Sequence, residues 1–215
     1  MKITVLCSSS DHPVNVMLQA WIARHQDGHE ISLVRSKKEL GGGDLLFLIS
    51  CDEIITGMER KKFTKTLVIH ASDLPKGRGW SPHIWEILNG AEEITVALLE
   101  AEDKVDAGAI WKKIHARIPK HALYDEINEI LFGAESQLMD FAVEQFVVVQ
   151  PQPQNPSVEP SYYPRRKPAD SEINPNQTLA SQFDLLRVCD PARFPAHFSI
   201  HGHRYRISIE KIEND

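Results

Sequence analysis

A nearly continuous apolar run at residues 44–51, Asp-Leu-Leu-Phe-Leu-Ile-Ser-Cys, constrains the fold of this chain more than any other feature. Runs of this kind are typical of central strands in a parallel sheet, because helices cover both faces of such a sheet. Shorter strand patterns occur at 3–6, 31–34, 65–69 and 94–99, and apolar residues recur at helical spacing between several of them. This alternation predicts an α/β fold with a Rossmann-like, doubly wound and mostly parallel sheet.

The second half of the chain divides into three parts. Apolar residues spaced by three and four over 123–142 predict a long amphipathic helix that packs across the sheet, within a catalytic domain of residues 1–149. Residues 150–163 are rich in proline and predict a linker. A helix predicted at 179–188 and a β-hairpin after it make residues 164–215 a short C-terminal extension. This extension is too small to bury much core alone, so we expect it to dock on the first domain.

Composition narrows the range of functions. The 215 residues carry a formal net charge of −6 at pH 7, which provides no basic face for nucleic acid. No apolar run approaches the ~18 residues of a membrane span, and residues 1–7 enter a strand pattern without a signal peptide. Cys7, Cys51 and Cys189 are far apart and odd in number, which is typical of reduced thiols. We therefore expect a cytoplasmic protein that acts on a small molecule, with the predicted hairpin offering an edge for a homodimer.

Two polar residues follow two of the predicted strands. His70 comes directly after the strand at 65–69, and Asp106 comes soon after the strand at 94–99. Ligands of open α/β sheets bind outside the carboxyl ends of the strands, so both side chains are expected in one crevice. An aspartate that accepts a hydrogen bond from a histidine fixes the tautomer of the ring and supports it as a general base. Spacing alone leaves open the alternative that His70 is a hydrogen-bonded histidine with no catalytic role.

The residues around His70 resemble a family signature. Residues 70–82 contain the order His-x-Ser-x-Leu-Pro…Arg-Gly…Pro, and residues 105–108 read Val-Asp-Ala-Gly. This order is similar to that of the folate-dependent formyltransferases, in which the histidine loop is followed by Asp-x-Gly. Residues 163–170 and 186–188 are similar to segments that close the catalytic domain in sugar and methionyl-tRNA formyltransferases. The likeness is greatest to bacterial amino-sugar N-formyltransferases, including those of pseudaminic acid pathways.

The resemblance implies transfer of a formyl group from N10-formyltetrahydrofolate, a co-substrate, to the primary amine of an amino sugar, either free or nucleotide-linked. It implies that His70 is the general base, that Asp106 is its orienting partner, and that no metal takes part. It also implies that the loop after His70 helps to wall the folate pocket. The residues expected to do so are Ser72, Leu74, Pro75, Arg78, Gly79 and Trp80.

One position departs from the family pattern. The family has an asparagine two residues before the histidine, where it donates a hydrogen bond to the tetrahedral oxyanion, and this chain has Val68. Loss of one oxyanion donor commonly costs ~10²–10³ in rate. Three alternatives follow. A protonated His70 or a backbone N–H stabilises the oxyanion, a side chain such as Ser72 replaces the asparagine, or the protein binds folate or a nucleotide sugar without catalysis.

Other reactions of the same class remain alternatives. Methionyl-tRNA formylation is the nearest, although enzymes of that kind resemble longer chains with a basic C-terminal domain. A formyltetrahydrofolate hydrolase would keep the His–Asp pair and use water as the nucleophile. Glycinamide ribonucleotide formylation is less consistent with the sequence, because residues 7–15 contain no well-formed phosphate loop.

Weaker signals lie outside the motif. Ser9, Ser10 and Asn15 stand at the start of a predicted helix and are candidates for binding a phosphate or nucleotide, although N-capping of the helix explains them more simply. Three histidines within 197–203 lie near the predicted hairpin turn without a matched cysteine or carboxylate partner. We therefore expect surface histidines there, and no metal site.

Overall fold

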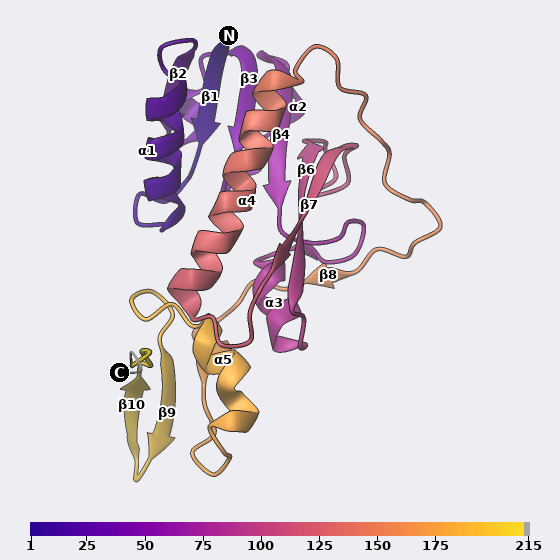
Figure 1. Ribbon diagram of the computed structural model, residues 1–215. Coiled ribbons are helices and arrows are strands. Elements are labelled where there is room, and N and C mark those ends of the chain that lie inside the picture. Colours follow the sequence, from indigo (N-terminus) through magenta and orange to yellow (C-terminus); the bar gives the residue numbers. More distant parts are fainter. Residues whose placement is uncertain (213–215) are drawn as a thin grey trace.

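The computed structural model describes residues 1–212 and has a six-stranded sheet at its centre, in the order β2-β1-β3-β4-β6-β7 (Figure 1). The first four strands in this order are parallel, β6 is antiparallel to β4, and β7 is antiparallel to β6. The six strands are β1 (Lys2–Leu6), β2 (Glu30–Val34), β3 (Gly43–Leu48), β4 (Phe63–His70), β6 (Glu93–Glu100) and β7 (Ile110–Arg117). This sheet and its helices confirm the predicted Rossmann-like α/β fold.

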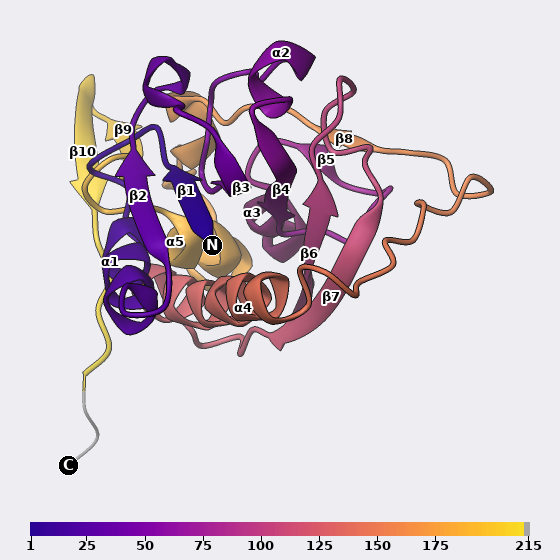
Figure 2. The ribbon, with the colours of Figure 1, turned by 90° about the horizontal axis from the view of Figure 1, so that it is seen from above.

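Two helices, α1 (Val14–His25) and α4 (Tyr124–Glu144), lie side by side on one face of the sheet (Figure 2). Alternate residues of the central strands point to this face and form the main core with both helices. Trp21 is fully buried there, and its Nε1 donates a hydrogen bond of 2.7 Å to Asp140 Oδ1, which joins the two helices. The long helix predicted at 123–142 is confirmed, and it packs over β6 and β7.

The opposite face of the sheet carries a smaller core. Strand residues that alternate with those of the main core pack there beneath α2 (Gly57–Arg60) and its neighbouring loops. The buried residues of this core are Leu6, Val34, Leu40, Leu46, Leu48, Ile55 and Phe63. The remaining short helices are η1 (Lys37–Glu39), α3 (Pro82–Leu88), η2 (Pro168–Ser171), η3 (Ala180–Gln182) and α5 (Phe183–Val188). In residues 1–212, none of the helices has both the length and the apolar character needed to cross a membrane.

The C-terminal part of the chain forms a small unit beyond the carboxyl ends of the parallel strands (Figure 1). It contains α5 and the antiparallel hairpin of β9 (Ala196–Ile200) and β10 (His203–Ile207), as predicted, with a turn at residues 201–202. A small core around Ile173 lies between these elements. Residues 213–215 of the predicted extension lie outside the described residues.

Buried polar contacts attach this unit to the rest of the molecule. Arg187 of α5 is only 1% exposed, and its Nη1 donates to the carbonyl oxygens of Pro119 at 3.2 Å and Ala122 at 3.4 Å. The hydroxyl of Tyr124, at the start of α4, donates to Asp190 Oδ2 at 2.9 Å. Two elements of the unit are therefore fixed to the segment that leads from β7 into α4.

Residues 150–163, called the proline-rich segment below, run along the outside of β6 and β7 and return towards α3 (Figure 1). Gln152 and Ile110 exchange two backbone hydrogen bonds of 2.7 and 2.8 Å, which tie the segment to the start of β7. At the other end, β8 (Tyr162–Tyr163) pairs in parallel with β5 (Arg78–Gly79). The proline-rich segment therefore lies against both the edge of the sheet and the loop that follows β4.

Candidate active site

His70 is the last residue of β4, and it is 7% exposed. Its Nε2 lies 2.8 Å from the carbonyl oxygen of Gly77, at hydrogen-bonding distance. Its Nδ1 lies 3.6 Å from Asp106 Oδ1, and the side chain of Asp106 is also 7% exposed. The two residues predicted as a general-base pair therefore lie together at a place that little water reaches.

Asp106 approaches His70 along a path that differs from the prediction. Strand β6 runs antiparallel to β4, with His70 opposite Ala97 and Leu67 opposite Glu100, so the carboxyl ends of the two strands point in opposite directions. The expectation that both side chains follow strand ends at one edge of a parallel sheet is wrong. Instead, the loop between β6 and β7 folds back and carries Asp106 in the left-handed backbone region, with φ of 53°.

Two glycines allow backbone segments to close around Asp106. A Cβ at Gly108 would lie 1.9 Å from the carbonyl oxygen of Glu100, so no other residue fits this turn without movement of the chain. Gly79 has φ of 100°, and a Cβ there would lie 2.5 Å from the carbonyl oxygen of Tyr163. The Gly79 N–H donates to Asp106 Oδ2 at 2.9 Å. Both glycines of the motif therefore serve close backbone packing around the carboxylate.

Most predicted side chains in the loop at 71–80 contact the protein itself. Ser72 is fully buried, and its hydroxyl donates to a backbone carbonyl of the same loop at 2.9 Å. Leu74 is buried in a small apolar cluster against β6. Trp80 is 40% exposed, and the guanidinium of Arg165 lies 4.6 Å from its ring centre. These three residues hold the loop or cover its outer side.

A cavity of about 310 Å³ opens between the β6–β7 loop and the proline-rich segment. From the loop after β4, Pro75 and Arg78 line this cavity, whereas the other four residues predicted to wall a folate pocket do not. Lys104 and Ala107 line it from the β6–β7 loop, and Gln154 lines it from the proline-rich segment. Its wall thus combines the cationic Arg78 and Lys104 with the acidic Glu102 and with apolar surface, next to the turn that carries the aspartate.

Two further histidines near His70 were not predicted. Burial lowers the pKa of His83 on α3 to about 4, and electrostatic interaction with His12, His70 and Arg166 lowers it in the same direction. Burial also lowers the pKa of His12 to about 4, with Arg193 as the second cause. Both rings are therefore neutral at pH 7, so they can hydrogen-bond a ligand without adding charge beside His70.

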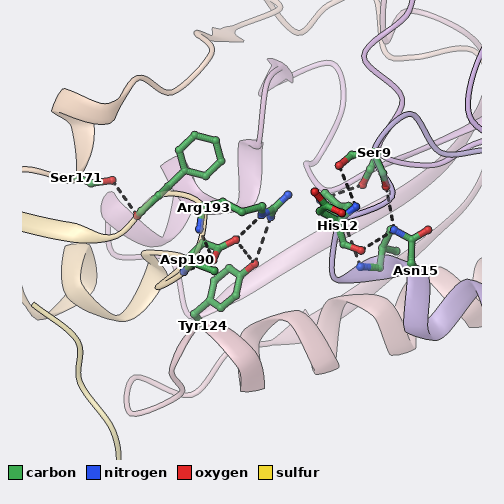
Figure 3. A network of polar contacts seen from close by, with 12 residues as sticks. Ser9, His12, Asn15, Tyr124, Ser171, Asp190 and Arg193 are labelled. Atoms are coloured by element: carbon green, nitrogen blue, oxygen red, sulfur yellow. Dashed lines mark hydrogen bonds and ion pairs between the residues drawn. The ribbon is translucent and has the colours of Figure 1, made fainter. Parts of the chain in front are cut away.

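His12 lies near a cluster of polar contacts in the C-terminal unit (Figure 3). Arg193 extends towards His12, and its Nη2 donates to the hydroxyl of Tyr124 at 3.3 Å. A cavity of about 10 Å³, room for about one water molecule, lies between His83, Tyr124 and Asn128. Within the described residues, the buried Nδ2 of Asn128 has no hydrogen-bond partner. This cavity shares no lining residue with the larger one, so two separate spaces lie near His70.

Asn15 organises the serine-rich loop after β1 (Figure 3). Its Nδ2 lies 2.7 to 3.1 Å from three backbone carbonyls of that loop, and its Oδ1 accepts a hydrogen bond of 2.7 Å from Arg35. Helix α1 begins after Pro13, and no side chain caps it. The simpler prediction of helix capping is therefore wrong, whereas Ser9 and Ser10 remain candidates for contact with a ligand.

Val68 lies on the same face of β4 as His70, since side chains alternate along a strand. It packs against apolar clusters that include Leu48 and Leu99. A valine offers no hydrogen bond, and the hydroxyl of Ser72, the side chain considered as a substitute, already donates to the backbone. Of the predicted alternatives for the oxyanion, the side-chain replacement by Ser72 therefore finds no support in the geometry.

The described residues contain no group of three or more His, Cys, Asp or Glu side chains placed to hold a metal ion. His201 and His203 are exposed at the hairpin turn, as expected. His197 is 8% exposed, so the prediction of a surface position is wrong for this residue. Its ring is covered because β9 packs over η2 and α5 in the C-terminal unit.

Comparison with known proteins shows what the chain is similar to. No family model matches the chain. Over 147 residues it is 28% identical to the methionyl-tRNA formyltransferase of Protochlamydia amoebophila (strain UWE25), a match that covers 66% of this chain and 46% of that protein. The chain is related to the folate-dependent formyltransferases. The match spans less than half the length of that formyltransferase.

Solved structures share the fold of this chain. A sugar N-formyltransferase from Shewanella sp FDAARGOS_354 superposes with a TM-score of 0.74 over 99% of both chains, at 17% identity. HypX from Aquifex aeolicus in complex with tetrahydrofolic acid superposes with a TM-score of 0.81, at 22% identity, over 97% of this chain and 37% of that chain. At these identities the likeness establishes the fold.

Proposed function

We propose that this protein transfers a formyl group from N10-formyltetrahydrofolate to a primary amine, with His70 as the general base. The observation that carries the proposal is the buried His70–Asp106 pair, with 3.6 Å between Nδ1 and Oδ1; Ala107, which follows Asp106 in the chain, lines a cavity of about 310 Å³. Relationship to the formyltransferases supplies the reaction class.

The chemistry needs one mobile proton. The amine nitrogen attacks the formyl carbon, the bond between that carbon and N10 breaks, and tetrahydrofolate leaves with a proton on N10. His70 accepts the proton that the attacking nitrogen loses, the carboxylate of Asp106 stabilises the resulting imidazolium, and His70 then returns this proton to N10 as tetrahydrofolate leaves. Nε2 now faces the Gly77 carbonyl at 2.8 Å, so proton acceptance at this atom requires that carbonyl to turn aside. Gly77 has φ of 71° and no side chain to resist the movement.

We propose that a folate binds in the larger cavity. Its volume lies at the lower end of the ~300–1,000 Å³ typical of small-molecule sites. Lys104 offers positive charge to a carboxylate of a folate tail, and Pro75, Ala107 and Val158 offer apolar contacts to its rings. The tetrahydrofolic acid complex of HypX, which has the same fold, supports a folate as the ligand. Bound there, the co-substrate supplies the activated formyl group next to the Asp106 turn.

We propose an amino sugar, free or nucleotide-linked, as the acceptor. The neutral His12 and His83, near His70, provide uncharged hydrogen-bonding groups that suit sugar hydroxyls. The net charge of −6 disfavours an RNA acceptor, because binding of nucleic acid draws on positive charge. Methionyl-tRNA is the second candidate, and the 28% identical relative favours it.

One incubation separates these functions. The protein is mixed with N10-formyltetrahydrofolate alone, with amino sugars and nucleotide-linked amino sugars, and with methionyl-tRNA, and release of tetrahydrofolate is followed. We expect release that depends on a sugar amine. Release without any amine would indicate a hydrolase, release with methionyl-tRNA alone would identify the second candidate, and binding without release would contradict the catalytic proposal.

A further inference from the structure

Gln154, in the middle of the proline-rich segment, connects the aspartate turn to the loop after β4. Its Nε2 donates to the carbonyl oxygen of Asp106 at 2.8 Å and to that of Gly108 at 3.0 Å. Its Oε1 accepts a hydrogen bond of 2.6 Å from Nη2 of Arg78, which is 5% exposed. The side chain of Gln154 thus binds two carbonyls of the turn that carries the Asp106 carboxylate, and it also binds the buried guanidinium of Arg78.

The Asp106 turn needs such support. A left-handed conformation, such as that of Asp106, is strained at a residue other than glycine and persists only where the surroundings hold it. Gln154 binds the two carbonyls that flank the strained turn, while the carboxylate receives the Gly79 N–H at 2.9 Å. The loop with Gly79 also contains Gly77, whose carbonyl contacts His70. The position of Asp106 therefore depends on contacts from two segments distant in sequence.

We infer that Gln154 is a positioning residue for the His70–Asp106 pair. It acts through the backbone of Asp106 and sets where the carboxylate stands relative to the imidazole. The consequence for catalysis rests on the proposed formyl transfer, whereas the consequence for the Asp106 turn does not.

An amide is needed at this position because both of its ends are used. Glutamate would keep an acceptor for Arg78, but it would lose the donor and set a negative charge against two carbonyl oxygens. Alanine would remove both interactions. Gln152 provides a matched control, because it lies on the same segment with an exposed side chain whose amide contacts the carbonyl of Gln150.

Amide hydrogen exchange at Gly79, measured by NMR on the full chain without ligand, tests the positioning directly. The Gly79 N–H donates to the Asp106 carboxylate, so its exchange reports how firmly that carboxylate is held. We expect exchange at Gly79 to be ~10-fold faster in Gln154→Ala and in Gln154→Glu, and unchanged in Gln152→Ala. The Ala101 amide, bonded within the sheet at 2.8 Å, should exchange equally in all four proteins. Unchanged exchange at Gly79 in Gln154→Ala overturns the inference.

Kinetics then test the link to catalysis. We expect kcat to fall ~10- to 100-fold in both Gln154 variants with little change in KM for the amine, because small misplacements of reacting groups carry costs of this size. Gln152→Ala should keep wild-type kcat. A rise in KM for formyltetrahydrofolate alone, with wild-type kcat and unchanged exchange at Gly79, would make Gln154 a ligand contact and overturn the positioning role. If the wild-type protein releases no tetrahydrofolate, the proposed function fails, while the exchange experiment still decides the role of Gln154.

Discussion

Acidification should destabilise this protein partly through His83, and replacement of His83 by glutamine should remove that part. Burial and electrostatic interaction with His12, His70 and Arg166 lower the pKa of His83 from 6.5 to about 4. The unfolded chain therefore takes up a proton at this site near pH 6.5, whereas the folded protein does not until about pH 4. The contribution to stability is complete above pH 6.5 and is lost as the pH falls towards 4. At pH 5 this linkage amounts to about 2 kcal/mol.

Urea unfolding at pH 7.5 and pH 5.0 measures the effect. We expect the wild-type free energy of unfolding to fall by about 2 kcal/mol more between these pH values than that of His83→Gln. Any cost of the substitution itself is present at both pH values and cancels in the comparison. His203→Gln, on the exposed side of the hairpin, is the control and should follow the wild type. If His83→Gln loses as much stability as the wild type on acidification, the ring is not held neutral by burial and the reasoning is refuted.

Three further substitutions probe the core, the aspartate turn and the oxyanion site. Burial raises the pKa of Glu135 to about 8. The stability that the protonated Glu135 side chain contributes is therefore present below pH 4.5 and lost as the pH rises to 8. Urea unfolding should show Glu135→Gln more stable than wild type by on the order of 2–4 kcal/mol at pH 8 and equally stable at pH 4.5. Gly108→Ala places a Cβ 1.9 Å from the Glu100 carbonyl and should lower the free energy of unfolding by about 2–4 kcal/mol; a change below about 0.5 kcal/mol would contradict the close packing. Val68→Asn restores a hydrogen-bond donor on the face of β4 that carries His70, and it should raise kcat at least ~10-fold. The buried amide should lower the free energy of unfolding by about 1–3 kcal/mol. A lower kcat in a folded variant would show that the oxyanion does not form beside this position.

Local sequence signals were sufficient for most of the central strands and for the long helix. The helix predicted at 123–142 is α4, Tyr124–Glu144, and the strand predicted at 94–99 is β6, Glu93–Glu100. Both depend on the spacing of apolar residues within a few turns or pleats, which the sequence displays directly. Strand β7 was not predicted, because in Ile110–Arg117 polar residues interrupt the apolar pattern, and its place at the sheet edge leaves only part of it buried.

The sequence predicted the residues of the candidate site, but not the strand direction and long-range contacts that bring them together. His70 and Asp106 were identified from their motif, yet the direction of β6 depends on long-range pairing that no local pattern specifies. Gln154 lies in a proline-rich stretch whose composition is typical of linkers, and its role appears only when that stretch folds against the Asp106 turn. The neutral state of His83 could not be predicted for the same reason, because it arises from burial among segments that are distant in the sequence.

The most direct test of the account compares wild type with His70→Gln and Asp106→Asn in the release of tetrahydrofolate from N10-formyltetrahydrofolate in the presence of an amino sugar acceptor. Glutamine and asparagine keep the approximate size of each side chain but remove the base and the carboxylate charge. The account predicts amine-dependent release by the wild type and a loss of ~10²-fold or more for each variant, with thermal unfolding unchanged enough to show that both remain folded. Near wild-type release by a folded His70→Gln protein would contradict it.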